Sequence, residues 1–416
     1  MENWSTSCVI AGGGPAGMML GLLLARAGVP VVVLEKHADF LRDFRGDTIH
    51  PSTLRVMAEL GLAEELLTLP HRKVAELKVQ LADGMTTIGQ FGRLRKFPYL
   101  AFMPQWDFLN FIATHAAAYP TFTLVHHAEV TGLIEDGDRV VGVHVTTPDG
   151  RRDIRATVVV GADGRHSVVR QAAGLPQVAR SAPMDVLWFR MSRRPADPED
   201  TFGVIRRGRF VAMINRTTYW QIAYLVPKGA AGALRAEPIE RFRAAVGEHV
   251  PFLADRTGEL GGWDDVSVLE VRVDRLRRWY RPGLLCIGDA AHAMSPIGGV
   301  GINLAVQDAV AAANALAGPL AAGGSDVGLG PLRAVQRRRE LPTRITQAVQ
   351  VLIQRRVISP LMHGAGEPVR LPLLARLVLR IPLTRAVPAL LFGRGVRLER
   401  VHTPKADPAD PADPVR

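Results

Sequence analysis

Two short runs of consecutive apolar residues near the N-terminus flank a segment whose apolar residues recur at helical spacing. The runs are Cys8–Ala11 and Val31–Leu34, and the segment between them is Met18–Ala27. Short apolar runs bounded by turn residues are typical of buried strands, whereas the longer apolar segment that ends at Gly28 indicates a helix. The pattern therefore predicts a strand–helix–strand unit, which is typical of α/β folds.

The pattern changes between about residues 184 and 226. Three mostly apolar segments separated by polar turns indicate strands of an antiparallel sheet that makes a second lobe: Asp185–Met191, Phe210–Ile214 and Tyr219–Leu225. Further along, Leu284–Ile287 is another apolar run that predicts a buried strand. Two long helices follow, one that begins within Gly298–Asn303 and runs through Ala317, and one from Pro331 to Ile358.

Composition excludes several classes of protein. The chain has 416 residues, 47% hydrophobic and 22% charged, which is ordinary for a globular protein of two domains or one two-lobed unit. Its net charge is +11, but the basic clusters at 206–209, 275–281 and 337–339 are scattered and match no nucleic-acid motif. We therefore expect a solvated basic surface that attracts anionic cofactors, and no nucleic-acid partner.

The compartment is predicted from cysteine use and from the termini. Cys8 and Cys286 each lie in an apolar run, without a disulfide framework or metal-ligand spacing, so we expect a cytoplasmic protein without a metal site. Residues 1–7 lead directly into the first strand and predict no signal peptide. Segment 371–392 is apolar but broken by arginines and prolines; it predicts no transmembrane segment and leaves membrane-surface contact open. Repeated Ala-Asp-Pro predicts a disordered tail over 403–416.

The turn after the first strand carries glycines at positions 12, 14 and 17. Gly12 permits a tight turn, Gly14 lets a pyrophosphate approach the backbone, and Gly17 lets the helix pack closely on the strand. Glu35 ends the second strand, where a carboxylate accepts hydrogens from a ribose diol. The order of elements predicts a dinucleotide site rather than an ordinary glycine-rich turn, and Glu35 favours FAD or NAD over NADP because its charge repels a 2′-phosphate.

Two more glycine-centred turns follow buried strands. The first is Gly161–Gly164, which contains Asp163. The second is Gly288-Asp289, followed by the loop Pro296–Asn303 at the start of a helix. A carboxylate such as Asp289 accepts a hydroxyl hydrogen, although it could also be a helix cap. The free N–H groups and the dipole of the helix that follows the loop stabilise negative charge.

These three motifs, in this order, resemble the para-hydroxybenzoate hydroxylase-like, single-component FAD monooxygenases over roughly residues 8–320. The resemblance implies that Asp289 binds the ribitol chain of FAD and that the loop faces the N1–C2=O edge of the flavin. It implies that Arg45 contacts the pyrophosphate and assists flavin reduction, the alternative being a solvated loop arginine. The full set of expected cofactor-binding residues is Gly12, Gly14, Pro15, Ala16, Gly17, Glu35, Lys36, Arg45, Gln105, Val130, Asp163, Asp289, Pro296, Gly298, Gly301, Ile302 and Asn303.

The resemblance also implies a reaction. NADH or NADPH reduces FAD, and O₂ then forms a flavin C4a-hydroperoxide that hydroxylates or epoxidises an aromatic or unsaturated small molecule. Two alternatives share the fold: another FAD-dependent oxidoreductase such as a reductase or dehydrogenase, and a non-redox flavoprotein cyclase. No side chain is assigned to catalysis except the assisting role of Arg45. The substrate, the choice of nicotinamide and the oligomeric state are left open.

Candidate substrate residues come from the second lobe. Trp188, Met213, Trp220 and Ile222 are large apolar residues on the predicted antiparallel strands and could line a pocket for an aromatic substrate. The alternative is that they form the core of the sheet.

The expected fold is α/β, with a Rossmann-like FAD-binding domain interleaved with an antiparallel β-sheet substrate domain and followed by C-terminal helices. Residues 1–70, 100–180 and 265–330 are assigned to the FAD-binding domain, and residues 71–99 and 181–264 to the substrate-binding domain. A helical segment, 331–402, precedes the tail.

Overall fold

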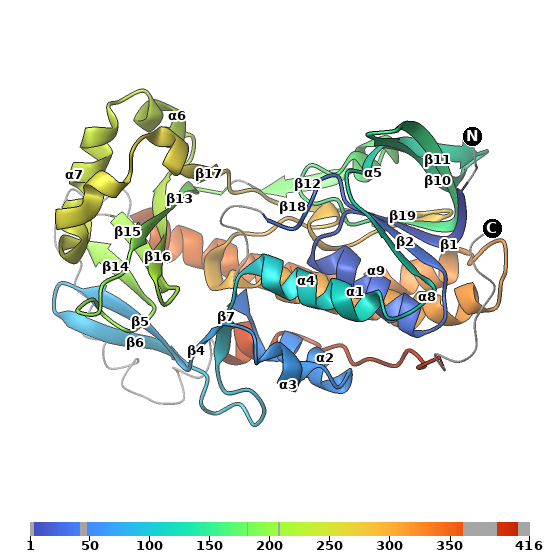
Figure 1. Ribbon diagram of the computed structural model, residues 1–416, viewed down its shortest axis with the longest axis horizontal. Coiled ribbons are helices and arrows are strands. Elements are labelled where there is room, and N and C mark those ends of the chain that lie inside the picture. The colour runs from blue at the N-terminus through green and yellow to red at the C-terminus, as the bar shows by residue number, and fades with distance from the viewer. Residues whose placement is uncertain (1–3, 42–47, 181, 207–208, 361–388, 407–416) are drawn as a thin grey trace.

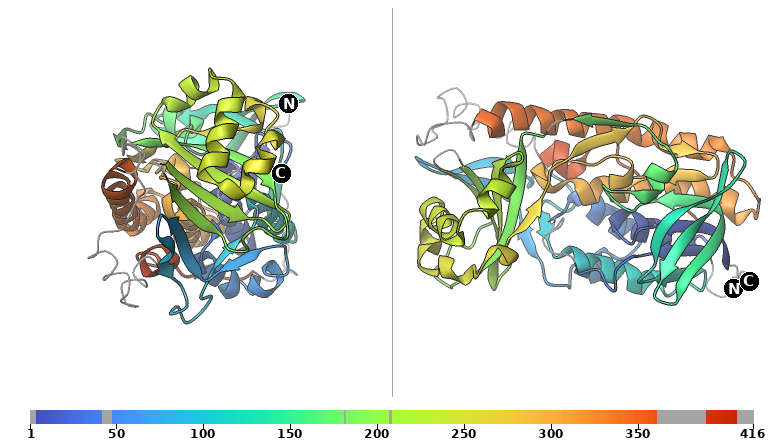
Figure 2. Two further views of the ribbon diagram at one scale, coloured as in Figure 1. Left: turned by 90° about the vertical axis from the view of Figure 1, so that its left-hand side faces the viewer. Right: turned by 90° about the horizontal axis from the view of Figure 1, so that it is seen from above.

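The computed structural model describes residues 4–41, 48–180, 182–206, 209–360 and 389–406. The molecule is elongated, with one sheet at each end and the long helices α8 (Gly301–Ala321) and α9 (Leu329–Ile353) running between them (Figure 1). Seen from above, α9 follows the length of the molecule (Figure 2). The two predicted lobes are therefore joined by helices as well as by strands.

The first sheet is a mainly parallel, Rossmann-like sheet. Its strand order is β19-β20-β11-β1-β2-β8; β20, β11, β1, β2 and β8 run parallel to one another, and β19 is antiparallel to β20. The antiparallel pair β9 (Glu129–Asp136) and β10 (Arg139–Thr147) continues from β11. The other strands of this sheet are β1 (Trp4–Ala11), β2 (Val31–Leu34), β8 (Phe122–Val125), β11 (Gly150–Gly161), β19 (Tyr280–Arg281) and β20 (Leu284–Cys286). The carboxyl ends of the parallel strands share one edge.

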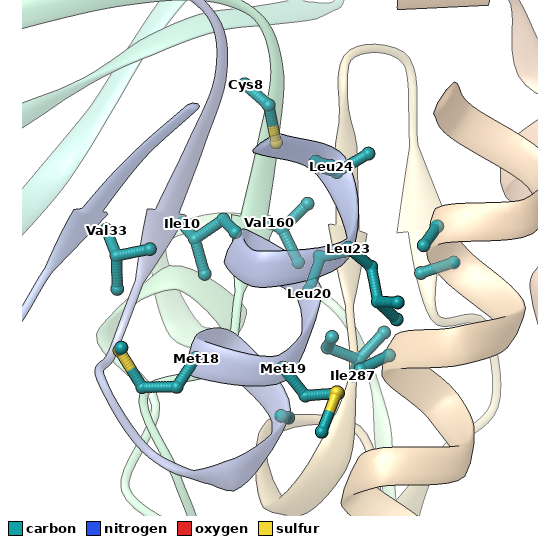
Figure 3. Packing of buried hydrophobic residues seen from close by; sticks show 14 of the residues in the cluster. Cys8, Ile10, Met18, Met19, Leu20, Leu23, Leu24, Val33, Val160 and Ile287 are labelled. Carbon is teal, nitrogen blue, oxygen red and sulfur yellow. The ribbon is translucent and has the colours of Figure 1, made fainter. Parts of the chain in front are cut away.

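Helix α1 (Pro15–Arg26) lies on this sheet, between it and α8. Ten of its twelve residues are buried, and apolar side chains of α1 meet those of β1, β2 and β11, such as Ile10, Val33 and Val160 (Figure 3). Such continuous apolar strands are expected where a parallel sheet is covered by helices. The apolar segment Ile297–Ala321 is long enough to cross a membrane, but most of it is buried inside the protein, as the core helix of a globular fold would be.

The second sheet is antiparallel except where β14 runs parallel to β5. Helices α6 (Ala230–Arg235) and α7 (Ile239–His249) cover one of its faces. The other face packs against Ile297 and Ile353 of the first lobe. In spatial order its strands are β17 (Ser267–Leu269), β13 (Met184–Ser192), β16 (Tyr219–Pro227), β15 (Arg209–Asn215), β14 (Phe202–Arg206), β5 (Glu76–Leu81) and β6 (Gly84–Gln90).

Short elements connect the lobes. A three-stranded sheet has the order β3-β7-β4, and β12 pairs with β18. The bounds of these and the remaining elements are β3 (Thr48–Ile49), α2 (Pro51–Glu59), α3 (Ala63–Leu66), β4 (Arg72–Val74), β7 (Leu100–Phe102), α4 (Gln105–Ala116), α5 (Val168–Ala172), β12 (Gln177–Arg180), η1 (Pro251–Glu259), η2 (Trp263–Asp265), β18 (Val273–Leu276), η3 (Gly288–Ala290), η4 (Ile297–Gly299), η5 (Gln354–Ile358) and η6 (Ala389–Arg394).

The predicted fold class is confirmed, with two local differences. Strand β17 belongs to the antiparallel sheet, although residues 265–330 were assigned to the cofactor lobe. The predicted disordered tail begins too early, because Thr403 is buried and the N–H of Ala406 donates to the carbonyl of Arg26 at 2.8 Å. Residues 407–416 and most of the apolar segment 371–392 lie outside the described residues.

Candidate functional site

The three motifs meet at the carboxyl edge of the first sheet. The Gly12 turn follows β1, Glu35 follows β2, Asp163 follows β11 and Asp289 comes after β20. The hydrogen-bond ladder between β1 and β2 continues into the turn after β1, since the N–H of Gly12 donates to the carbonyl of Leu34 at 2.8 Å. Open α/β sheets bind ligands at this edge, where the connections from neighbouring strands diverge. Here that point lies between β1 and β11.

The glycines of the first motif are needed for three different reasons. Gly12 has φ +104°, and a Cβ there would lie 2.4 Å from the carbonyl oxygen of Ala162. A Cβ on Gly17 would lie 2.0 Å from the carbonyl oxygen of Gly12, so the helix can approach the strand only without one. A Cβ on Gly14, by contrast, would have no described atom within 4 Å. Gly14 therefore borders open space at the N-terminus of α1, where a phosphate would be stabilised.

Glu35 is hydrogen-bonded to the same turn. Its Oε2 accepts the N–H of Gly13 at 3.0 Å, and its Oε1 accepts the N–H of His37 at 3.0 Å. The side chain is 8% exposed. These bonds fix the carboxylate beside the glycine turn, where an acidic residue suits the hydroxyls of a ribose.

The two aspartates have different surroundings. Oδ2 of Asp163 accepts the N–H of Val169, in the first turn of α5, at 3.1 Å. Burial raises the pKa of Asp163, although Ser167 and nearby N–H groups oppose the shift. The side chain of Asp289 is 34% exposed, and its Oδ2 lies 3.6 Å from Nη2 of Arg165. Asp163 thus shapes its turn, whereas the Asp289 carboxylate is accessible to a ligand.

The loop before α8 presents bare backbone. Gly298 and Gly299 have φ +80° and +62°, a region that favours glycine. The first residues of α8 follow directly, so its free N–H groups lie next to the loop. Asn303 anchors the helix start, with Oδ1 accepting the backbone N–H of His50 at 3.2 Å and the hydroxyl of Thr53 at 2.6 Å. The start of α8 can therefore direct N–H groups at a planar, partly anionic group.

The other predicted cofactor residues are spread around this edge. Pro15 and Ala16 begin α1, and Gln105 begins α4. Several others are placed only by position: Lys36 is exposed beside Glu35, Pro296 precedes η4, Gly301 and Ile302 begin α8, and Val130 is buried on β9. Arg45 lies outside the described residues.

The candidate substrate residues do not share one face of the second sheet. Met213, Trp220 and Ile222 are fully buried in the cluster with the side chains of α6 and α7. Trp188 is half-buried on the opposite face, in the cluster that includes Ile297. The sheet-core alternative thus describes the first three residues, and only Trp188 faces the loop that precedes α8.

We call the face of the second sheet that carries Trp188 its inner face. It carries further residues that were not among the candidates from the sequence. Phe210 and Ala212 lie in the same cluster as Trp188, and Ala223 pairs with both Trp188 and Ala212. Gln221, which is 3% exposed, pairs with Arg190 and Ile214 farther along the same strands. Arg216 donates through Nε to Oε1 of Gln221 at 2.9 Å. Strict alternation along the strands, counted from Trp220, would have assigned these residues to one face.

His50 was not selected as a site residue, yet it lies at the centre of the loop contacts. It is fully buried, and its Nδ1 is 2.9 Å from the carbonyl oxygen of Phe392. Burial lowers the pKa of His50 to about 4, although carbonyls of Phe392 and the 298–299 turn oppose the shift. The imidazole is therefore neutral at physiological pH.

The arrangement fits a flavin adenine dinucleotide. The open backbone at Gly14 suits the pyrophosphate, Glu35 suits the adenosine ribose, and the accessible carboxylate of Asp289 suits a polyol chain. Ile297 of the 296–303 loop packs in the same cluster as Trp188, so this loop lies next to the inner face of the second lobe.

Comparison with known proteins agrees with an FAD site. Residues 5–349 match the family model described as FAD binding domain. The 6-methylpretetramide 4-monooxygenase of Streptomyces rimosus is 34% identical over 391 residues, covering 92% of this chain and 91% of that protein. The dialkyldecalin synthase of Streptomyces rugosporus is 28% identical over 325 residues, covering 74% of this chain and 64% of that protein.

Among solved structures, OxyS anhydrotetracycline hydroxylase from Streptomyces rimosus has the same fold, with a TM-score of 0.73, 24% identity and coverage of 94% of this chain and 76% of that chain. The match of the family model over most of the chain, together with the full-length relative, shows the family. The chain belongs to the para-hydroxybenzoate hydroxylase-like, FAD-dependent monooxygenases.

Proposed function

We propose that this enzyme hydroxylates an aromatic, pretetramide-like small molecule with NAD(P)H and O₂. The observation that carries the proposal is the 34% identity to 6-methylpretetramide 4-monooxygenase over nearly the whole length of both chains. The accessible Asp289 carboxylate and the two glycines with positive φ just before α8 support the cofactor assignment. When bound, FAD supplies the electron transfer and the activation of O₂.

The residues of the chain bind and orient. The N-terminus of α1 holds the pyrophosphate, while Glu35 and Asp289 accept hydroxyl hydrogens of the ribose and the ribitol. The start of α8 directs N–H groups at the flavin edge, where negative charge develops on reduction. Arg45 and Gln105 complete the proposed set beside the ring.

The substrate is proposed to bind against the inner face of the second sheet. Trp188 and Phe210 offer aromatic surface there, and Ala212 leaves room between the strands. Arg216 and the buried Gln221, which are hydrogen-bonded to each other, add polar groups that can orient a phenol or a carbonyl. Apolar walls with few polar groups are typical of sites for small aromatic ligands, and they keep water from the reacting carbon.

We also propose the division of the chain into a cofactor domain (1–70, 100–180 and 265–330), a substrate domain (71–99 and 181–264), a C-terminal segment (331–402) and a tail (403–416). A cytoplasmic location is proposed from the two buried, unpaired cysteines. Membrane-surface contact by the C-terminal segment stays a secondary proposal.

The test is a screen of polycyclic phenols and anthraquinones for substrate-stimulated NAD(P)H oxidation, with mass spectrometry of the products. A hydroxylated product formed in step with NAD(P)H consumption supports the proposal. Oxidation of NAD(P)H that no compound stimulates or couples to a product would contradict it.

A second candidate is a non-redox cyclase. Its support is the relative named dialkyldecalin synthase, which matches 74% of this chain. Turnover of a polyene without NAD(P)H or O₂ would favour the cyclase, whereas O₂-independent turnover with NAD(P)H would favour a reductase.

A further inference from the structure

A buried network of charged side chains lies behind the turn that carries Asp289. Asp308 of α8 is fully buried, and its Oδ2 accepts the N–H of Gly288 at 3.1 Å and lies 2.5 Å from Nε2 of His292. Oδ1 accepts Nε–H of Arg339 at 2.9 Å. Burial alone would raise the pKa of Asp308, but His292 and Arg339 lower it below its usual value. The ionised carboxylate therefore ties the turn to α8 and α9.

Arg339 extends this network to the end of the chain. We call residues 389–406 the C-terminal strap. Arg339 is 1% exposed, and its Nη1 lies 3.3 Å from Oε1 of Glu399 and 3.2 Å from the carbonyl oxygen of Arg397. Glu399 is itself 4% exposed and donates its backbone N–H to Oε1 of Gln307 at 2.6 Å. One buried arginine thus joins two buried carboxylates, one on α8 and one on the strap.

The other end of the strap reaches the loop before α8. The ring of Phe392 lies 3.2 Å from the position that a Cβ on Gly298 would take. The carbonyl of the same residue accepts Nδ1–H of His50, whose backbone N–H is bonded to Asn303. The strap therefore covers the outer side of the loop while Glu399 fixes it against α8.

We propose that Arg339 and Glu399 are positioning residues for FAD binding. They hold the strap against α8, so that the 288–289 turn and the 296–303 loop keep the shape that receives the flavin. The inference rests on the proposed FAD site at these two segments. Arg339 and Asp308 lie within residues 5–349, the part matched by the family model, whereas the strap follows it.

The physical reason is that buried charges must be paired. Without Arg339, the carboxylates of Asp308 and Glu399 remain in a low-dielectric interior without their shared cation. They must then take up protons or draw in water, and Asp308 no longer holds Gly288 in place. A displaced turn moves Asp289 away from the cofactor.

The adjacent arginine provides a matched control. Arg338 also binds Glu399, with Nε 2.8 Å from Oε1, but its side chain is 42% exposed, and the only carboxylate it contacts among the described residues is Glu399. Arg339→Ala should raise the FAD dissociation constant at least tenfold and shift the midpoint potential of bound FAD. Arg338→Ala should change the dissociation constant less than twofold. Arg339→Lys should restore part of the affinity because it keeps the charge.

Glu399→Gln tests the strap with a smaller perturbation. It should weaken FAD binding about three- to tenfold by fluorescence titration, while the far-UV circular dichroism of the apoprotein is unchanged. If Arg339→Ala binds FAD with the wild-type affinity and midpoint potential, the proposal is overturned. It is also overturned if Arg338→Ala loses as much FAD affinity as Arg339→Ala. If Arg339→Ala does not fold, unchanged affinity in both Arg339→Lys and Glu399→Gln overturns it.

Asp289→Ala separates this proposal from the function on which it rests. If Asp289→Ala weakens FAD binding but the Arg339 and Glu399 variants do not, the strap has no positioning role and the FAD site stands. If Asp289→Ala has no effect, the site assignment itself fails.

Discussion

The two sheets present functional groups in different ways. In the first, five parallel strands end at one edge, so whatever follows each strand is brought to the same place. In the second, antiparallel strands lie flat between α7 and the loop at Ile297, so the face on which a side chain lies decides its role. At the first sheet, a residue joins the site when it directly follows the end of a strand. At the second sheet, whether a residue has an odd or even place along its strand decides which face its side chain lies on.

The comparison predicts that the two tryptophans of the second sheet differ sharply. Trp220 is fully buried, and its Nε1 donates to Asp197 at 3.0 Å. Trp220→Ala should lower the free energy of unfolding by about 3–5 kcal/mol, as expected for removal of a buried aromatic side chain. Urea unfolding measures the loss. A loss below about 1 kcal/mol would show that Trp220 is not part of the packed core.

His50 gives the first lobe a pH dependence. Its pKa is lowered to about 4 in the folded protein, from 6.5 when exposed, so only the unfolded chain takes up this proton between those pH values. Stability therefore falls as pH falls from 6.5 towards 4, by about 3 kcal/mol from this residue. Urea unfolding at pH 7 and pH 4.5 should show a smaller decrease for His50→Gln than for wild type. Equal decreases would exclude His50 as the cause.

Asp289→Ala probes the edge of the first sheet. The loss of a charged hydrogen bond to a hydroxyl should weaken FAD binding by about 1.5–3 kcal/mol, without loss of the apoprotein fold because the side chain is partly exposed. Fluorescence quenching measures the dissociation constant. Asp163→Ala is the contrasting variant, and should lower stability more than Asp289→Ala does, because Asp163 accepts the N–H of Val169 in the first turn of α5.

Trp188→Ala should have the smallest effect on stability and a specific effect on turnover. Because Trp188 is half-buried on the inner face, we expect the KM for the aromatic substrate to rise about five- to tenfold while FAD affinity is unchanged. Steady-state kinetics with the substrate found in the screen measure this. An unchanged KM would remove Trp188 from the proposed substrate site.

The sequence allowed the first site to be predicted because its signals are local. Gly12, Gly17 and Glu35 follow strands at fixed spacing, and backbone sterics require glycine where a Cβ would collide with a carbonyl. The role of the candidate substrate residues depends on which face of the sheet packs on the helices, and residue type alone left open whether Met213, Trp220 and Ile222 line a pocket or form the core of the sheet. His50 and Glu399 act through contacts 253 and 92 positions distant in sequence, which no local pattern reveals.

The central claim is that the flavin site of the first sheet delivers oxygen to a substrate on the inner face of the second. The most direct measurement is turnover under ¹⁸O₂ with mass spectrometry of the product. The account predicts one ¹⁸O atom per product molecule and NAD(P)H consumption in step with it. A product formed without label from ¹⁸O₂, or formed in the absence of O₂, would contradict it.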